Sequence, residues 1–246
     1  MRPDASNKIA KVTPKKGPNV VLFGAVIALI VVLAVVIAIV VANNGKSTTN
    51  AGTQTVPAGV VGGTGGGILV DPAAKAGVPT LDVYADFQCP NCGKFEKAFG
   101  PALTTLANAG QVKYVVHMMS FLDTNIGNDS SKRASNAAAC ASDAGKFAGY
   151  HSAVFAAQPA KEGDGYTDAQ LTEFATTAGI TGPALATWQK CTSSGQHNKY
   201  VADVADASGK AGIKQTPTIK LNGKEIAIET LTNPDALVAQ IKAAKS

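Results

Sequence analysis

The 246-residue chain has few charged and few aromatic side chains. Only 16% of its residues are charged and 6% are aromatic, whereas 46% are hydrophobic, so it is not a disordered polymer. Five of its 22 basic residues and one acidic residue fall within residues 1–19, and the rest of the chain carries 17 basic against 16 acidic residues. A nearly neutral body lacks the basic patch that binds a polyanion, which excludes nucleic-acid binding.

Histidine and cysteine, two common ligands of metal ions, are scarce as well. The three histidines, His117, His151 and His197, share no metal-ligand spacing, and we expect them to be surface or satisfied core residues. The glycine-rich run over residues 62–67 lacks the Gly-Lys-Ser/Thr ending of a phosphate-binding loop. The sequence therefore predicts neither a metal site nor a soluble cofactor.

One long hydrophobic run is present, over residues 20–42, and its 23 residues include no charged side chain. As a helix it would span about 35 Å, enough for a hydrocarbon core of about 30 Å. A buried core helix is rarely so uniformly apolar, and a cleaved signal peptide has an apolar region of only about 7–15 residues. We therefore expect an uncleaved transmembrane anchor that crosses the cell membrane once.

The segments on either side of this run predict its orientation and its link to the rest of the chain. The basic tail over residues 1–19 is expected to stay in the cytoplasm, which places everything after Ala42 outside the membrane. Residues 43–66 are rich in glycine, threonine and asparagine and predict a flexible tether. Residues 67–246 are then expected to form one extracytoplasmic domain.

A strand, a helix and a second strand are predicted early in this domain. Residues 80–86 and 112–118 are strand-like runs. Between them, apolar side chains recur every three or four residues over 95–107, which is the spacing of one face of a helix. A strand–helix–strand unit implies a parallel pair of strands with a right-handed crossover.

Residues from about 130 to 210 are rich in alanine and punctuated by glycine, and they predict a helical insert. Short helices are expected over residues 131–148, 150–157, 167–178, 183–192 and 197–208. A hairpin is expected over residues 218–228, because Asn222-Gly223 favours a two-residue turn, and Asn233 is expected to cap a last helix. The predicted fold is an α/β sandwich whose two halves are separated by a helical subdomain.

The four cysteines, Cys89, Cys92, Cys140 and Cys191, permit three pairings, and an even count outside the cytoplasm favours disulfides. A Cys89–Cys92 bond would close a ring too small to stabilise the fold much, so it is better explained as a redox-active disulfide that forms and breaks during the reaction. A Cys140–Cys191 bond would close a loop of about 50 residues, worth roughly 4 kcal/mol, and would be structural. The alternatives to a redox role are a zinc knuckle and a structural hairpin disulfide, but zinc sites usually need two close pairs of cysteines.

The position of Cys-Pro-Asn-Cys indicates its chemistry. A strand ends near Asp86 and a helix begins at Cys89 or Pro90, so the Cys89 sulfur faces unpaired amides at the positive helix end, which stabilise a thiolate. Cys92, one turn further on, would be more buried and would resolve a mixed disulfide. Asp86 is either a proton relay for that resolving thiol or a strand-end residue in a salt bridge or cap.

Several segments together resemble the DsbA-like thiol–disulfide oxidoreductases of the thioredoxin superfamily, in particular the membrane-anchored versions of Gram-positive actinobacteria that carry a second disulfide in the helical insert. These segments are residues 84–92, 138–141, 145–147 and 215–218. The resemblance covers essentially all of 67–246 and implies a thioredoxin-like fold with a helical insertion. The acid that thioredoxins bury in the preceding strand has no counterpart, because Val83 stands about where it should be.

The resemblance also implies that Pro217 is a cis-proline beside the cysteines, with Thr216 offering backbone groups to an extended substrate. The residues alone favour a trans bond, since only about 5–6% of X–Pro bonds are cis. The expected function is oxidation of thiols in unfolded exported proteins through Cys89 and Cys92. The resemblance implies reoxidation by a quinone-linked membrane oxidase, a VKOR or DsbB homologue.

Two alternatives remain open at this point. The same chemistry in reverse would make the chain a reductase or isomerase fed by a membrane electron donor. The resemblance favours an oxidase, because Pro-His and similar pairs between the cysteines accompany oxidants among DsbA-like proteins, whereas reducing thioredoxins carry Gly-Pro. Isomerases are usually dimers, and no dimerisation segment is visible, so a monomer is expected. The other alternative is a tethered, non-catalytic thioredoxin-fold binding module, which requires Cys89 to be buried and inert.

Overall fold

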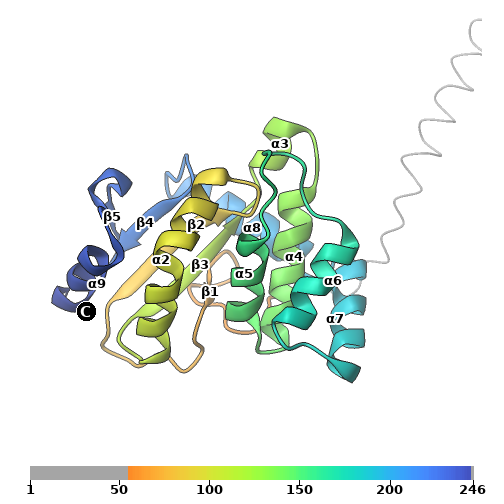
Figure 1. Cartoon of the computed structure of the whole chain (residues 1–246), viewed down its shortest axis with the longest axis horizontal. Helices are drawn as coiled ribbons and strands as arrows, with labels where there is room; N and C mark the ends of the chain where they lie inside the picture. Colours follow the sequence, from red (N-terminus) through yellow and green to blue (C-terminus); the bar gives the residue numbers. More distant parts are fainter. Residues whose placement is uncertain (1–54, 245–246) are drawn as a thin grey trace, which may run out of the picture. The chain divides into compact units, whose positions relative to one another are not determined.

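The computed structural model describes residues 55–244, which form a mixed five-stranded sheet covered by helices (Figure 1). The strand order is β1-β3-β2-β4-β5. The strands are β1 (Ile68–Leu69), β2 (Thr80–Asp86), β3 (Lys113–Met119), β4 (Thr218–Leu221) and β5 (Lys224–Ile226). The central pair β2 and β3 is parallel, as predicted, and every other pairing is antiparallel.

Helix α2 (Pro90–Asn108) makes the crossover between β2 and β3 and covers one face of the sheet. The strands alternate between two faces: the Tyr114 hydroxyl contacts Glu96 of α2, whereas the neighbouring Val115 lies beside Ala207 of α8 (Asn198–Lys210). The sheet is therefore enclosed between α2 and α8. Helix α9 (Pro234–Ala243) also packs against α2, and Asn233 caps it by accepting the Ala236 N–H at 2.9 Å.

The helical insert between β3 and β4 is confirmed, with two corrections. Its helices are α3 (Leu122–Ile126), α4 (Ser130–Asp143), α5 (Phe147–Ala156), α6 (Asp168–Thr177), α7 (Gly182–Ser194) and α8. The helix expected over 131–148 is divided between α4 and α5, because Gly145 adopts a left-handed φ of 66° and turns the chain. Short α3 carries no strong periodic signal and was not predicted.

The hairpin is shorter than predicted. Its turn has positive φ at Asn222 and Gly223, as the Asn-Gly pair favours. Strand β5 ends at Ile226, however, and residues 228–230 form a 3-10 turn (η1, Ile228–Thr230) instead of continuing the strand.

The predicted tether boundary is wrong, because residues 55–66 pack against the insert. The Ala58 N–H donates to Asp143 at 2.8 Å, the His197 ring lies 2.8 Å from the Thr55 carbonyl oxygen, and the Tyr200 hydroxyl donates to the Gly66 carbonyl at 2.8 Å. Within residues 55–66, backbone groups make these hydrogen bonds. The prediction of a tether was based on side-chain composition, which does not detect such bonds. The ordered domain therefore begins by residue 55, and residues 43–54 lie outside the described residues.

Between residues 55 and 244, no helix is both long and apolar enough to cross a bilayer. The basic tail over 1–19 and the anchor predicted over 20–42 lie outside the described residues.

Candidate active site

Cys89 lies where strand β2 gives way to helix α2. The chain turns there because the Cys89 N–H donates to the Asp86 carbonyl at 3.0 Å, and Cys89 then serves as the N-cap residue of α2. Pro90 occupies the first helical position, where its missing N–H costs no hydrogen bond. Cys92 follows inside the first turn and is fully buried. Both cysteines are free thiols in this structure.

The two thiols have opposite acidities. The pKa of Cys89 is lowered to about 6, and the largest cause is a hydrogen bond from Cys92. Burial by itself would raise this pKa, whereas hydrogen bonds from the backbone N–H groups of Asn91 and Cys92 lower it further. Burial raises the pKa of Cys92 well above its usual value. At neutral pH, Cys89 is therefore mostly thiolate, the form that attacks disulfides, while Cys92 remains a thiol that donates to it.

The loop before β4 approaches Cys89 from the other end of the chain. The Thr216–Pro217 peptide bond is cis, and the Thr216 carbonyl oxygen lies 3.4 Å from the Cys89 sulfur. The two positions are 127 residues apart in sequence. This juxtaposition places backbone polar groups beside the nucleophile, where an extended polypeptide could pair with them.

Asp86 is fully buried, and its carboxyl group points into a polar cluster of the insert. Its Oδ1 accepts hydrogen bonds from the Ser131 hydroxyl at 2.5 Å and from the Gln88 N–H at 2.9 Å. Burial is the largest influence on this group and raises the pKa of Asp86 to about 7. The backbone of Asp86 lowers the pKa of Cys92 slightly, against the larger effect of burial. The Asp86 carboxyl group thus holds α4 to the active-site segment.

The second pair of cysteines lies in the insert. Cys140 of α4 and Cys191 of α7 form a disulfide, with their Cα atoms 6.0 Å apart. In the described chain, the one cluster with metal-ligand proximity combines these two sulfurs with His197, and both sulfurs are already bonded to each other. The other two histidines lie against different carboxylates, His117 near Asp82 and His151 near Glu96.

A family model for thioredoxin matches residues 71–243, which include both cysteines of the motif and the cis-proline. The chain belongs to the thioredoxin family. Among curated proteins, none matches the chain.

Solved structures identify the kind of thioredoxin-family protein. DsbA from Mycobacterium tuberculosis, in its oxidised form, is 34% identical, with a TM-score of 0.57 over 69% of this chain and 86% of its own. A disulfide oxidoreductase (DsbG) from the same organism is 33% identical, with a TM-score of 0.57 over 69% of this chain and 81% of its own. MdbA, a thiol-disulfide oxidoreductase from Actinomyces oris, shares the fold at 20% identity, with a TM-score of 0.67 over 81% of this chain and 97% of its own. The chain is thus a DsbA-like thiol–disulfide oxidoreductase.

Some residues around the cysteines of this thioredoxin-family domain were not found from the sequence. The Gln158 side chain donates to the carbonyl oxygens of Phe87 at 2.8 Å and Cys89 at 3.0 Å, and the Tyr166 hydroxyl also donates to the Phe87 carbonyl, at 2.9 Å. These two insert residues brace the segment that carries Cys89. Glu96, seven residues after Cys89, was also missed. It is 7% exposed on the inner face of α2, although a charged residue in an amphipathic helix is ordinarily expected to face solvent.

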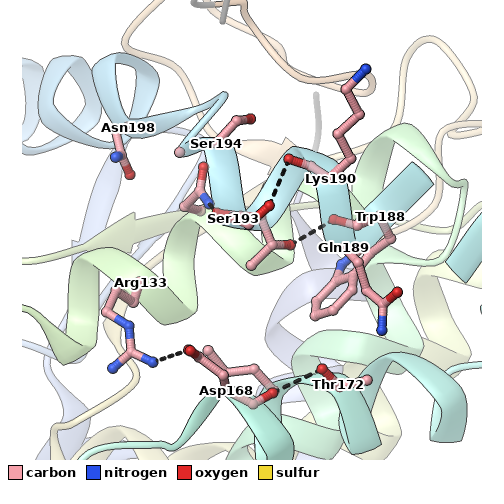
Figure 2. Close-up of a pocket in the computed structure, with 13 residues that line it drawn as sticks. Arg133, Asp168, Thr172, Trp188, Gln189, Lys190, Ser193, Ser194 and Asn198 are labelled. Carbon is pink, nitrogen blue, oxygen red and sulfur yellow. Dashed lines mark hydrogen bonds and ion pairs between the residues drawn. The ribbon is translucent and has the colours of Figure 1, made fainter. Parts of the chain in front are cut away.

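A cavity of about 640 Å³ lies in the insert, and the residues that line it include neither Cys89 nor Cys92 (Figure 2). Arg133 and Asp168 form an ion pair on one side of it, and Trp188 contributes to its wall. The hydroxyls of Thr172 and Ser193 donate to backbone carbonyls of their own helices. Because these polar groups are already engaged, we assign this cavity no part in the chemistry.

The raised pKa of Asp86 predicts a pH-dependent stability. The pKa of Asp86 is about 7 in the folded state, against an ordinary value of 3.8. Between these two pH values the folded state binds more protons than the unfolded state. The free energy of unfolding therefore falls as the pH rises from 4 to 7. We expect a loss on the order of 4 kcal/mol at most. Urea unfolding at pH 5 and pH 8 measures the part that falls between these values, roughly 2–3 kcal/mol, and Asp86→Asn should remove most of the difference. An equal pH dependence in the variant would contradict the assignment to Asp86.

Proposed function

We propose that this chain is an extracytoplasmic oxidase that introduces disulfides into newly exported proteins. The observation that carries the proposal is the asymmetric pair at the start of α2: a Cys89 thiol with a pKa of about 6, beside a buried Cys92 and the carbonyl oxygen of Thr216. A low pKa stabilises the reduced enzyme relative to its disulfide, and such a pair gives its disulfide away readily.

The proposed reaction begins with the oxidised Cys89–Cys92 pair. A client thiolate attacks the Cys89 sulfur, the Cys89–Cys92 bond breaks, and a mixed disulfide forms between the client and Cys89. The second client thiol, as its thiolate, then attacks the client sulfur of that bond and expels Cys89 as a thiolate. Two electrons pass from the client dithiol to the enzyme; one proton ends on Cys92, and the other goes to solvent because Cys89 stays mostly thiolate at neutral pH. The Thr216–Pro217 loop would hold the client backbone beside Cys89.

The proposed location rests on the sequence. The hydrophobic run over 20–42, with basic residues before it, supports a single-pass anchor in the cell membrane with the catalytic domain outside. The reduced enzyme needs an electron acceptor, and a quinone-linked membrane oxidase of the VKOR or DsbB type fits a membrane-tethered monomer. Unfolded exported proteins with free thiols are the proposed clients.

A reductase or isomerase is the second candidate, because the same cysteine pair carries out thiol–disulfide exchange in either direction. A non-catalytic module is less well supported. Cys89 is only 7% exposed, as that alternative requires, but the hydrogen bonds that lower its pKa make it reactive rather than inert.

The reduction potential of the Cys89–Cys92 pair distinguishes the two catalytic directions. In glutathione buffers, we expect the protein to equilibrate near about −120 mV, in the range of strong oxidants. The physical reason is the stabilised Cys89 thiolate, which lowers the free energy of the reduced form. A potential near about −270 mV, the range of reducing thioredoxins, would reverse the proposed electron flow and support the reductase.

A further inference from the structure

The side chain of Gln158 reaches the active-site segment from the helical insert. Helix α5 ends just before Gln158, and Pro159 follows it, which favours an extended backbone at Gln158. The Gln158 N–H donates to the Phe155 carbonyl at 3.2 Å, and the Phe155 ring packs on the Phe87 ring with their centroids 4.9 Å apart. The turn that carries Gln158 is therefore fixed to the chain just before Cys89.

The amide of Gln158 matches the two carbonyl groups that it meets. A primary amide nitrogen carries two N–H bonds. Nε2 of Gln158 donates to the Phe87 carbonyl at 2.8 Å and to the Cys89 carbonyl at 3.0 Å. The reverse orientation would set the amide oxygen against two carbonyl oxygens, so these contacts fix which atom is the nitrogen. A carboxylate in the same place would have no proton to donate.

The Cys89 carbonyl is the acceptor from which helix α2 starts. It accepts the Gly93 N–H at 3.2 Å, and Cys89 is the N-cap residue of the helix. In the same first turn, the N–H groups of Asn91 and Cys92 stabilise the Cys89 thiolate. The Gln158 amide thus fixes the peptide from which this turn begins. It also places an N–H dipole against the negative end of the carbonyl that belongs to Cys89 itself.

Helix α2 leaves room for this amide at Gly93. A Cβ atom there would overlap Gln158 Oε1 and would lie 2.9 Å from Gln158 Cδ, so a residue with a side chain would push the amide away. Glycine is less favourable than alanine within a helix, so helix stability does not explain its presence. The approach of Gln158 does explain it.

We propose that Gln158 is a positioning residue for the cysteine pair, and that the absence of a side chain at Gly93 is what admits it. Gln158 holds the Cys89 carbonyl and thereby keeps the first turn of α2 with its N–H groups aimed at the Cys89 sulfur. It favours the reduced pair, in which Cys89 is charged, over the neutral disulfide. The inference rests on the proposed function and deepens it, because it names an insert residue that sets how strongly the pair oxidises.

The test compares Gln158→Ala and Gln158→Glu with the wild type in the reduced full-length protein. The rate at which iodoacetamide alkylates Cys89, measured against pH, reports the pKa of this thiol. We expect the pKa of Cys89 to rise by about 0.5–1 in Gln158→Ala. It should rise further in Gln158→Glu, because a carboxylate cannot donate and adds negative charge near the thiolate. In glutathione buffers, the equilibrium should move about 3- to 10-fold toward the Cys89–Cys92 disulfide.

Gly93→Ala leaves Gln158 in the chain but removes the space that it occupies. Alanine favours a helix, so this variant should remain folded, yet it should shift the alkylation profile and the glutathione equilibrium as Gln158→Ala does. The Gly93→Ala/Gln158→Ala double variant should show no further shift, since both changes remove the same hydrogen bonds. Gly209→Ala in α8, where a Cβ atom would meet nothing within 4 Å, is the matched control and should leave both measurements unchanged.

Tyr166→Phe separates the two carbonyl groups. The Tyr166 hydroxyl donates to the Phe87 carbonyl at 2.9 Å, whereas Gln158 also holds the carbonyl of Cys89. This variant should therefore raise the pKa of Cys89 less than Gln158→Ala does. An equal rise would show that holding Phe87 is sufficient, and it would overturn the role given to the Cys89 carbonyl.

The outcomes separate the inference from the proposed function. A wild-type alkylation profile and glutathione equilibrium in Gln158→Ala and Gly93→Ala would overturn the inference alone, whatever their melting temperatures, because a merely structural contact changes only the stability. Shifts that add in the double variant would show that Gly93 and Gln158 act independently, against the inference. Failure of wild-type Cys89 to react with glutathione would overturn the proposed function itself.

Discussion

Replacement of Cys89 by serine is expected to abolish oxidation of a dithiol peptide by the full-length protein, a loss of about 1,000-fold or more to the uncatalysed background. A serine hydroxyl is not ionised at neutral pH and cannot form a disulfide. The remaining thiol, Cys92, is fully buried with a pKa raised well above its usual value by burial, so it cannot replace Cys89. The rate of peptide oxidation in a glutathione buffer measures the effect.

Cys92→Ser is the matched control, because it removes the other sulfur of the same pair. It should also stop turnover, but the remaining Cys89 thiolate should form a stable adduct with oxidised glutathione that mass spectrometry detects. Cys89→Ser should form no such adduct. If Cys92 is modified as readily as Cys89, the assignment of nucleophile and resolving thiol in the structure is reversed.

The cysteine pair could be predicted from the sequence because its context is local. The strand over 80–86, the Cys-Pro-Asn-Cys segment and the following helix are adjacent in the chain, and each has its own pattern. The observed β2 has the predicted bounds, and α2 begins at Pro90, directly after Cys89. Local patterns therefore sufficed to place a thiol at a helix N-terminus.

The groups that surround the pair could not be predicted in this way. Gln158 and Tyr166 reach the active-site segment from 71 and 79 residues away, measured to Phe87, and no spacing rule connects such positions. Glu96 was missed because periodicity places charged residues on the solvent face, whereas Tyr114 and Gly100 allow this one to be buried. The packing of residues 55–66 was missed for a related reason, since backbone groups rather than side chains make most of its hydrogen bonds.

Loss of the Cys140–Cys191 disulfide is expected to destabilise the domain without removing its reactive thiol. The bond joins residues 51 positions apart, and in the chain-entropy model a loop of that length contributes roughly 4 kcal/mol. For a domain of this size, that corresponds to a fall in Tm of about 8–16 °C. A Cys140→Ser/Cys191→Ser double variant avoids leaving a single thiol that could pair with Cys89, and calorimetry measures the change in Tm.

The matched control for this variant is Cys89→Ser/Cys92→Ser, which also removes two sulfurs. The ring that this second pair closes is very short, so its loss should change the free energy of unfolding much less. In the insert double variant, Cys89 should still be alkylated at the wild-type rate, because the groups that lower the pKa of Cys89 come from α2 and the Thr216 loop rather than from α4 or α7.

An unchanged Tm would show that packing around the insert disulfide, not the cross-link, holds α4 and α7 together. A loss of Cys89 reactivity at a temperature where the variant is folded would instead connect the insert to the chemistry.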